Sequence, residues 1–79
     1  KMKDDKTFNE CLIEKRVKEI NECLSDSRYR VAVDINQGTI TFIKIFYSSC
    51  QYLHGLTQEE MIRVLSAMSI ILKLKEEKI

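Results

Sequence analysis

Two stretches with the hydrophobic period of a helix flank a stretch with the two-residue period of a strand. In the first third of the chain, apolar residues recur at spacings of three and four, which predicts a helix over residues 7–25. The same spacing near the other end predicts a helix over residues 57–77. Each helix begins with a capping box, in which a threonine (Thr7 or Thr57) and a glutamate three residues later bond each other's backbone amides.

Between these helices the pattern predicts a β-hairpin. Apolar and polar residues alternate over residues 29–35, and a turn with a glycine leads into a second strand over residues 39–47. Two registers stay open. A three-residue loop pairs Ile35 with Thr39, whereas a two- or four-residue loop pairs Ile35 with Ile40. We prefer the second register because it separates apolar from polar side chains better.

The second predicted strand is apolar on both of its faces. One face carries Ile40, Phe42 and Phe46, and the other carries Ile43, Ile45 and Tyr47. A strand with one face in water should alternate in polarity, so something should cover both faces of this strand. Because the two helices are expected to cover one face, the other face predicts contact with a partner.

The order helix, hairpin, helix predicts a two-layer α+β domain (α-β-β-α) that occupies residues 1–79. We expect residues 1–6 to be disordered and residues 48–56 to form a loop. A two-stranded sheet is marginal, and a core of this size rarely supplies more than about 3–5 kcal/mol. Dimerisation into a larger antiparallel sheet would add the missing burial. The alternative is a topology in which one chain buries both faces of the hairpin.

Surplus apolar residues outside the predicted core define the expected protein interface: Ile43, Ile45, Tyr47, Ile70 and Leu74. They favour a homodimer, or contact with another protein. The hypothesis that follows is a non-enzymatic interaction module that acts as an inhibitor, adaptor or regulator of a larger protein. A composition rich in Ile and Lys suits the A+T-rich genome of a bacterium, phage or plasmid, and so an accessory protein of a phage or mobile element.

A second hypothesis is nucleic-acid binding by the hairpin. Arg28, Arg30 and Lys44 could contact phosphates while Tyr29 or Tyr47 stacks on bases. The net charge of +1, from 13 Lys and Arg against 12 Asp and Glu, gives no long-range field toward nucleic acid or membranes, so this hypothesis ranks below the first. A third hypothesis is capture of a small ligand, such as a nucleotide, at a dimer interface.

Candidate chemistry is sparse, and we predict no enzymatic activity, metal or cofactor. The three cysteines are an odd number, which argues against a disulfide framework and favours reduced thiols in the cytoplasm. Cys50 and His54 lack the further ligands that zinc requires, and no third residue is placed to orient His54 for nucleophilic chemistry. We expect no signal peptide, because the N-terminal region is charged. We also expect no membrane partner, because the charges balance and every apolar run is far shorter than the roughly 20 residues that cross a bilayer.

Overall fold

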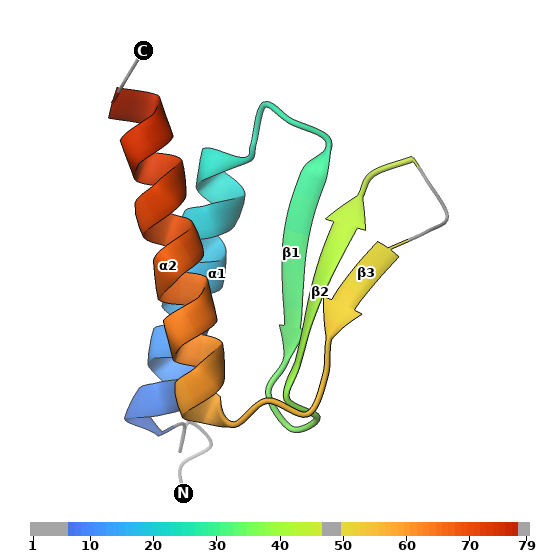
Figure 1. Cartoon of the computed structure of the whole chain (residues 1–79), viewed down its shortest axis with the longest axis vertical. Helices are drawn as coiled ribbons and strands as arrows, with labels where there is room; N and C mark the ends of the chain where they lie inside the picture. Colours follow the sequence, from blue (N-terminus) through green and yellow to red (C-terminus); the bar gives the residue numbers. More distant parts are fainter. Residues whose placement is uncertain (1–6, 47–49, 78–79) are drawn as a thin grey trace, which may run out of the picture.

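The computed structural model describes residues 7–46 and 50–77, which form two helices and a three-stranded antiparallel sheet (Figure 1). In chain order the elements are α1 (Phe8–Cys23), β1 (Tyr29–Asp34), β2 (Thr39–Lys44), β3 (Cys50–Leu53) and α2 (Gln58–Glu77). The predicted α+β class, with a hairpin between two helices, is confirmed. The predictions for residues 1–6 and for Tyr47 lie outside the described residues.

Strand β3 lies within residues 48–56, where we predicted a loop. It pairs antiparallel with β2, so the sheet order is β1-β2-β3 and β2 is the central strand. Four residues are too few for a two-residue period to stand out in the sequence, and the extended form of β3 is selected by its pairing with β2. In this central position the side chains of β2 have neighbours from β1 and β3 on both faces of the sheet, although neither strand covers a face of β2.

Strand β2 ends at Lys44 rather than continuing to residue 47 as predicted. Phe46 has a φ of 76°, in the left-handed region that non-glycine residues rarely adopt. Its side chain is 88% exposed. The predicted place of Phe46 beside Ile40 and Phe42 is therefore wrong, because the chain turns out of the strand before it reaches Phe46.

The hairpin register differs from both registers that the sequence left open. Ile40 pairs with Val33, whereas the preferred prediction pairs it with Ile35, two residues further along the strand. A shift of two residues keeps every side chain on its face, so apolar sorting cannot detect it. The turn depends instead on Gly38, which has a φ of 65° and accepts a hydrogen bond of 2.9 Å from the N–H of Leu56.

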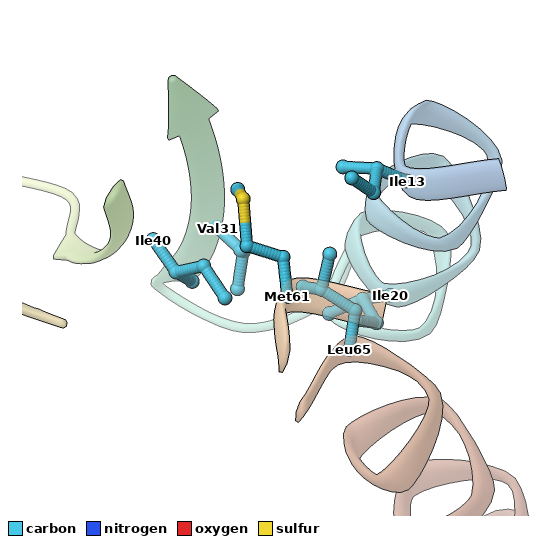
Figure 2. Packing of buried hydrophobic residues seen from close by; sticks show 6 residues of the cluster. All are labelled: Ile13, Ile20, Val31, Ile40, Met61 and Leu65. Atoms are coloured by element: carbon cyan, nitrogen blue, oxygen red, sulfur yellow. The ribbon is translucent and has the colours of Figure 1, made fainter. Parts of the chain in front are cut away.

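Both helices lie on one face of the sheet, side by side and running in the same direction (Figure 1). Helix α1 contacts both α2 and β1. Figure 2 shows the core between the two layers, which consists of Ile13, Ile20, Val31, Ile40, Met61 and Leu65. Alternation along β2 then places Thr41 and Ile43 on the opposite face, which the helices leave uncovered.

Both capping boxes are formed as the sequence predicts. The hydroxyls of Thr7 and Thr57 each accept a hydrogen bond of 3.1 Å from the N–H of Glu10 and Glu60, respectively. The two carboxylates accept hydrogen bonds from the threonine N–H groups in return. These contacts fix where the two helices begin, and therefore how they are aligned against the sheet.

Candidate functional site

Polar contacts between the helices set their alignment. Arg16 Nε donates to Ser66 Oγ at 3.3 Å, and Ser69 Oγ donates to Glu19 Oε1 at 3.4 Å. Partners in both pairs are 50 residues apart, so the helices are parallel with a constant offset. With this offset the end of α1 at Cys23 lies beside residue 73. Helix α2 therefore extends past the end of α1.

Glu19 is the polar centre of this helix pair. Its carboxylate also accepts from Arg16 Nη1 at 3.1 Å and lies 3.8 Å from Lys73 Nζ. Desolvation raises the pKa of Glu19, but the hydrogen bond from Arg16 and the charges of Lys73, Arg16 and Lys15 outweigh it. The net result is a pKa below the ordinary value of 4.5, so the ionised form of Glu19 stabilises the pairing of α1 with α2.

An apolar groove of about 310 Å³ opens between the C-terminal half of α2 and the sheet, which we call the α2 groove. Its lining consists of Leu24, Tyr29, Arg30, Val31, Phe42, Met68, Ile71 and Leu72, and the surface that these residues expose to it is entirely apolar. Three parts of the fold meet at the groove: residues 68–72 of α2, Leu24 at the end of α1, and the paired strands β1 and β2. Sizeable apolar hollows with few polar groups are typical binding sites.

Large apolar side chains are exposed around this end of the molecule. Ile71 is 57% exposed and Tyr29 is 50% exposed, and both line the α2 groove. Ile70 and Leu74 are 59% and 54% exposed, and their spacing of four residues places them together on another face of α2. This end of α2 thus presents two adjoining apolar surfaces, of which one is hollow.

The five predicted interface residues are not brought together. Ile43 is half-buried on the uncovered face of the sheet, and Ile45 is half-buried just beyond the end of β2. Ile70 and Leu74 lie on α2, which packs on the opposite side of the sheet. Tyr47 lies outside the described residues. The sequence thus predicts exposure correctly for the two helix positions but does not predict their separation from the strand positions.

Sequence reasoning missed the α2 groove because it assigned the aliphatic lining residues to a closed core and considered Tyr29 and Arg30 only as nucleic-acid contacts. No local signal marks the groove. Its α2 residues, such as Leu72, belong to the apolar stripe of the helix, and whether they face a closed core or a hollow depends on where the end of α1 meets the sheet.

Arg30, a predicted nucleic-acid contact, is held by the backbone at the end of α1. Its guanidinium donates hydrogen bonds to the carbonyl oxygens of Leu24 at 2.8 Å, Ser27 at 3.0 Å, Tyr29 at 2.7 Å and Ser25 at 3.3 Å. These bonds tie together the backbone from the end of α1 to the start of β1. The side chain thus has a structural role in the connection between α1 and β1.

The other two hairpin cations lie near the same end of the sheet. Lys44 Nζ lies 5.7 Å from the centre of the Tyr29 ring, in a cation–π contact. Arg28 is exposed in the connection that precedes β1. Binding of nucleic acid by these residues stays a prediction, and Arg30 would have to leave its carbonyl partners to take part.

Cys50 and His54 both lie at the β3 edge of the sheet. Cys50 is exposed as a free thiol, and His54 Nδ1 lies 3.1 Å from Thr39 Oγ1. The His54 ring also meets the Tyr52 ring edge-on, with 6.4 Å between centres. Across the parts of the chain that the structure describes, no three His, Cys, Asp or Glu side chains are grouped to hold a metal ion.

These features define a small two-layer α+β domain with an apolar groove at one end of its helix layer. No family model matches the chain, and neither a curated protein nor a solved structure is similar enough to count as a match. Over residues 7–46 and 50–77, neither helix offers an apolar stretch of the length that a bilayer span requires.

Proposed function

We propose that this protein is a small non-enzymatic interaction module that binds a larger protein through the α2 groove, as an inhibitor, adaptor or regulator. The observation that carries the proposal is the groove itself. Its volume is about 310 Å³, and the surface that lines it is entirely apolar. Covering such a surface with apolar groups of a partner is favourable in water.

The chemistry of the groove favours an apolar anchor over a polar ligand. A nucleotide or sugar needs polar groups that fix its orientation, and the exposed lining of the α2 groove supplies none. Insertion of large apolar side chains from an amphipathic helix suits a hollow of this kind. The proposed partner segment is therefore a helix with one apolar stripe.

Basic residues around the groove add a second criterion for this partner segment. Arg30 borders the groove, and Lys44 lies over Tyr29 at its sheet side. Lys75 follows Ile71 by four residues and therefore shares its side of α2. An apolar stripe flanked by Asp or Glu would complement these cations, which sets the orientation and the rate of association more than the affinity.

Two adjacent isoleucines of α2 allow a matched test. Ile70 and Ile71 are exposed by 59% and 57%, but only Ile71 lines the groove. A photo-crosslinking residue such as benzoylphenylalanine, placed at either position in the native host, should give a discrete protein adduct from position 71 and not from position 70. Absence of an adduct from position 71, or a stronger adduct from position 70, would contradict binding in the groove.

Once the crosslinked protein is identified, purified variants test the energetics. Ile71→Glu should weaken its binding by at least about tenfold, or 1.4 kcal/mol, because a carboxylate would be buried against an apolar anchor. Ile70→Glu is the control of equal exposure and should bind within about twofold of the wild type. Isothermal titration calorimetry measures both affinities.

A further inference from the structure

The two outer edges of the sheet, on β1 and on β3, differ in how their outward-facing backbone groups are bonded. On the outer edge of β1, Asn21 Nδ2 donates to the carbonyl oxygen of Val31 at 2.9 Å, and the N–H of Val31 donates to Asn21 Oδ1 at 2.8 Å. Two residues before Val31 on the same edge, the N–H of Tyr29 donates to Ser27 Oγ at 3.0 Å. Side chains thus occupy the positions that another strand would need, which protects this edge from pairing.

The pattern of hydrogen bonds shows which backbone groups of β3 point outward. Ile45 N–H donates to the carbonyl of Arg28 at 2.7 Å, so odd-numbered residues of β2 bond to β1. Even-numbered residues of β2 therefore bond to β3, where their partners are Gln51 and Leu53. Tyr52, between these two, directs its N–H and C=O away from the sheet.

In the part of the chain that the structure describes, the β3 edge lacks the usual devices that block pairing. All four residues of β3 are exposed, and Tyr52 is 63% exposed. From Cys50 to Leu56 the sequence contains no Asp, Glu, Lys, Arg or Pro. Edge strands are normally protected by charges, by proline or by a covering element. Within residues 7–46 and 50–77, no side chain occupies the outward backbone groups of Tyr52 as Asn21 occupies those of Val31, so this edge can accept another strand.

We propose that β3 pairs antiparallel with β3 of a second copy of this chain, about a two-fold axis beside Tyr52. The two sheets then join into one continuous sheet, with hydrogen bonds from the outward-facing groups of Tyr52 and of the residues two positions before and after it. This inference goes beyond the proposed function, and it leaves one α2 groove free on each copy.

The composition of β3 favours a second copy as the occupant of this edge. A two-fold axis at Tyr52 places each Tyr52 opposite its own counterpart, Cys50 opposite His54, and Gln51 opposite Leu53. A strand with a charge at the axis would meet the same charge on its mate. This uncharged strand meets no such repulsion, and the two tyrosine rings gain a cross-strand contact.

Introducing a charge at the two-fold axis gives the first test. Tyr52→Lys and Tyr52→Glu should each be monomeric in sedimentation equilibrium, whereas the wild type should dimerise at concentrations up to about 1 mM, since small interfaces have a Kd in about the micromolar to millimolar range. An equimolar mixture of the two variants should restore a dimer. Ala32→Lys is the control, because Ala32 lies exposed in the same cross-strand row and on the same face, but on β1.

A wild type that stays monomeric over this range would overturn the proposal, as would Tyr52 variants that still dimerise or a mixture that stays monomeric. Ile71→Glu separates this proposal from the first one. It should weaken partner binding by at least about tenfold and leave the dimer intact. Loss of the dimer in Ile71→Glu but not in Tyr52→Lys would place self-association in the α2 groove and overturn pairing through β3.

A disulfide test keeps the proposal falsifiable if the charged variants fail to fold. In a Cys11→Ser, Cys23→Ser background, His54→Cys should place its thiol opposite Cys50 of the second copy. Residues that face each other in a hydrogen-bonded antiparallel pair have Cα atoms about 5.5 Å apart, and a disulfide can span this distance. Within one chain, four residues of extended backbone separate positions 50 and 54 by about 13 Å, too far to bridge.

Mild oxidation of the His54→Cys variant should therefore give a covalent dimer on non-reducing gels, and mass spectrometry should identify the link between positions 50 and 54. The matched control is Ala32→Cys in the same background, which should not form a link between positions 32 and 50. Absence of the first link, or equal yields of the two, would overturn the proposed register.

Discussion

The side-chain amide of Asn21 bonds both backbone groups of Val31, with distances of 2.9 Å and 2.8 Å. One side chain of α1 thus takes the place of a fourth strand along part of β1. The contact joins the helix layer to the sheet and also closes one edge of the sheet. Val31 is a core residue, so this contact also holds β1 in the position from which the Val31 side chain packs against the helices.

Asn21→Ala should lower the free energy of unfolding by about 1–3 kcal/mol, because the variant leaves both backbone groups of Val31 without their partners. Urea unfolding followed by circular dichroism measures this loss. Lys18→Ala, at an exposed site on the same helix, is the control and should change stability by less than about 0.5 kcal/mol. Equal stability of the two variants would show that water replaces the amide without loss.

The two glycines provide a matched pair, since Gly38 and Gly55 have φ values of 65° and 77°. Alanine at either position adopts the left-handed conformation at a cost of about 1–2 kcal/mol. At Gly38 a Cβ would in addition overlap the backbone of Leu56, whereas at Gly55 no atom of the described chain lies within 4 Å. We expect Gly55→Ala to lose about 1–2 kcal/mol and Gly38→Ala roughly 2–5 kcal/mol.

Thermal unfolding of the two glycine variants in parallel checks this difference. A loss of the same size in both would mean that the connection from β3 to α2 moves away from the turn without cost. In that case the crossing of Leu56 over Gly38 does not hold the hairpin in register.

Most of the fold follows from local patterns. The helical stripes and the two capping boxes locate α1 and α2, because each signal is complete within a few residues. The hairpin register does not follow, since a two-residue shift preserves the face of every side chain and the deciding contact joins Gly38 to Leu56, far along the chain. Strand β3 is likewise defined by its partner rather than by its own four residues.

The candidate site was harder to predict than the fold. The exposed positions Ile70 and Leu74 follow from a helix that is apolar around more of its circumference than one buried face needs. The α2 groove depends on the offset between two parallel helices, which Arg16, Glu19 and their serine partners set across the helix pair. No local pattern encodes that offset.

Arg30→Lys tests the structural role of the hairpin arginine. An ammonium cannot reproduce the fork of hydrogen bonds that the guanidinium makes to four carbonyls, so we expect a loss of about 1–2 kcal/mol in urea unfolding. Arg28→Lys, at an exposed site, should leave stability within about 0.5 kcal/mol of the wild type.

The same pair of variants separates a structural role from nucleic-acid binding. If the role of Arg30 is to contact phosphates, Arg30→Lys should keep both the positive charge and the stability of the wild type. The wild type should then bind single-stranded DNA or RNA with an affinity that falls steeply as the salt concentration rises. We expect instead no salt-dependent binding in fluorescence anisotropy at low ionic strength. Strong binding there would favour the nucleic-acid hypothesis over the interaction module.

Acid should weaken the pairing of the two helices through Glu19. The pKa of this carboxyl lies below its ordinary value of 4.5, because the hydrogen bond from Arg16 and the nearby cations outweigh its desolvation. The folded state therefore binds the proton less readily than the unfolded state. The stabilisation is present above about pH 4.5 and is lost as the pH falls through the pKa of the folded state.

Glu19→Gln shows this dependence most directly. The difference in unfolding free energy between wild type and variant should be largest near about pH 7 and should shrink as the pH falls below about 4.5, because the wild-type carboxyl is then protonated as well. Arg16→Met removes the main group that lowers the pKa, so its acid-induced loss should be smaller than that of the wild type. A wild-type minus Glu19→Gln difference that stays constant from neutral to acid pH would show that Glu19 contributes through packing and neutral hydrogen bonds, not through its charge.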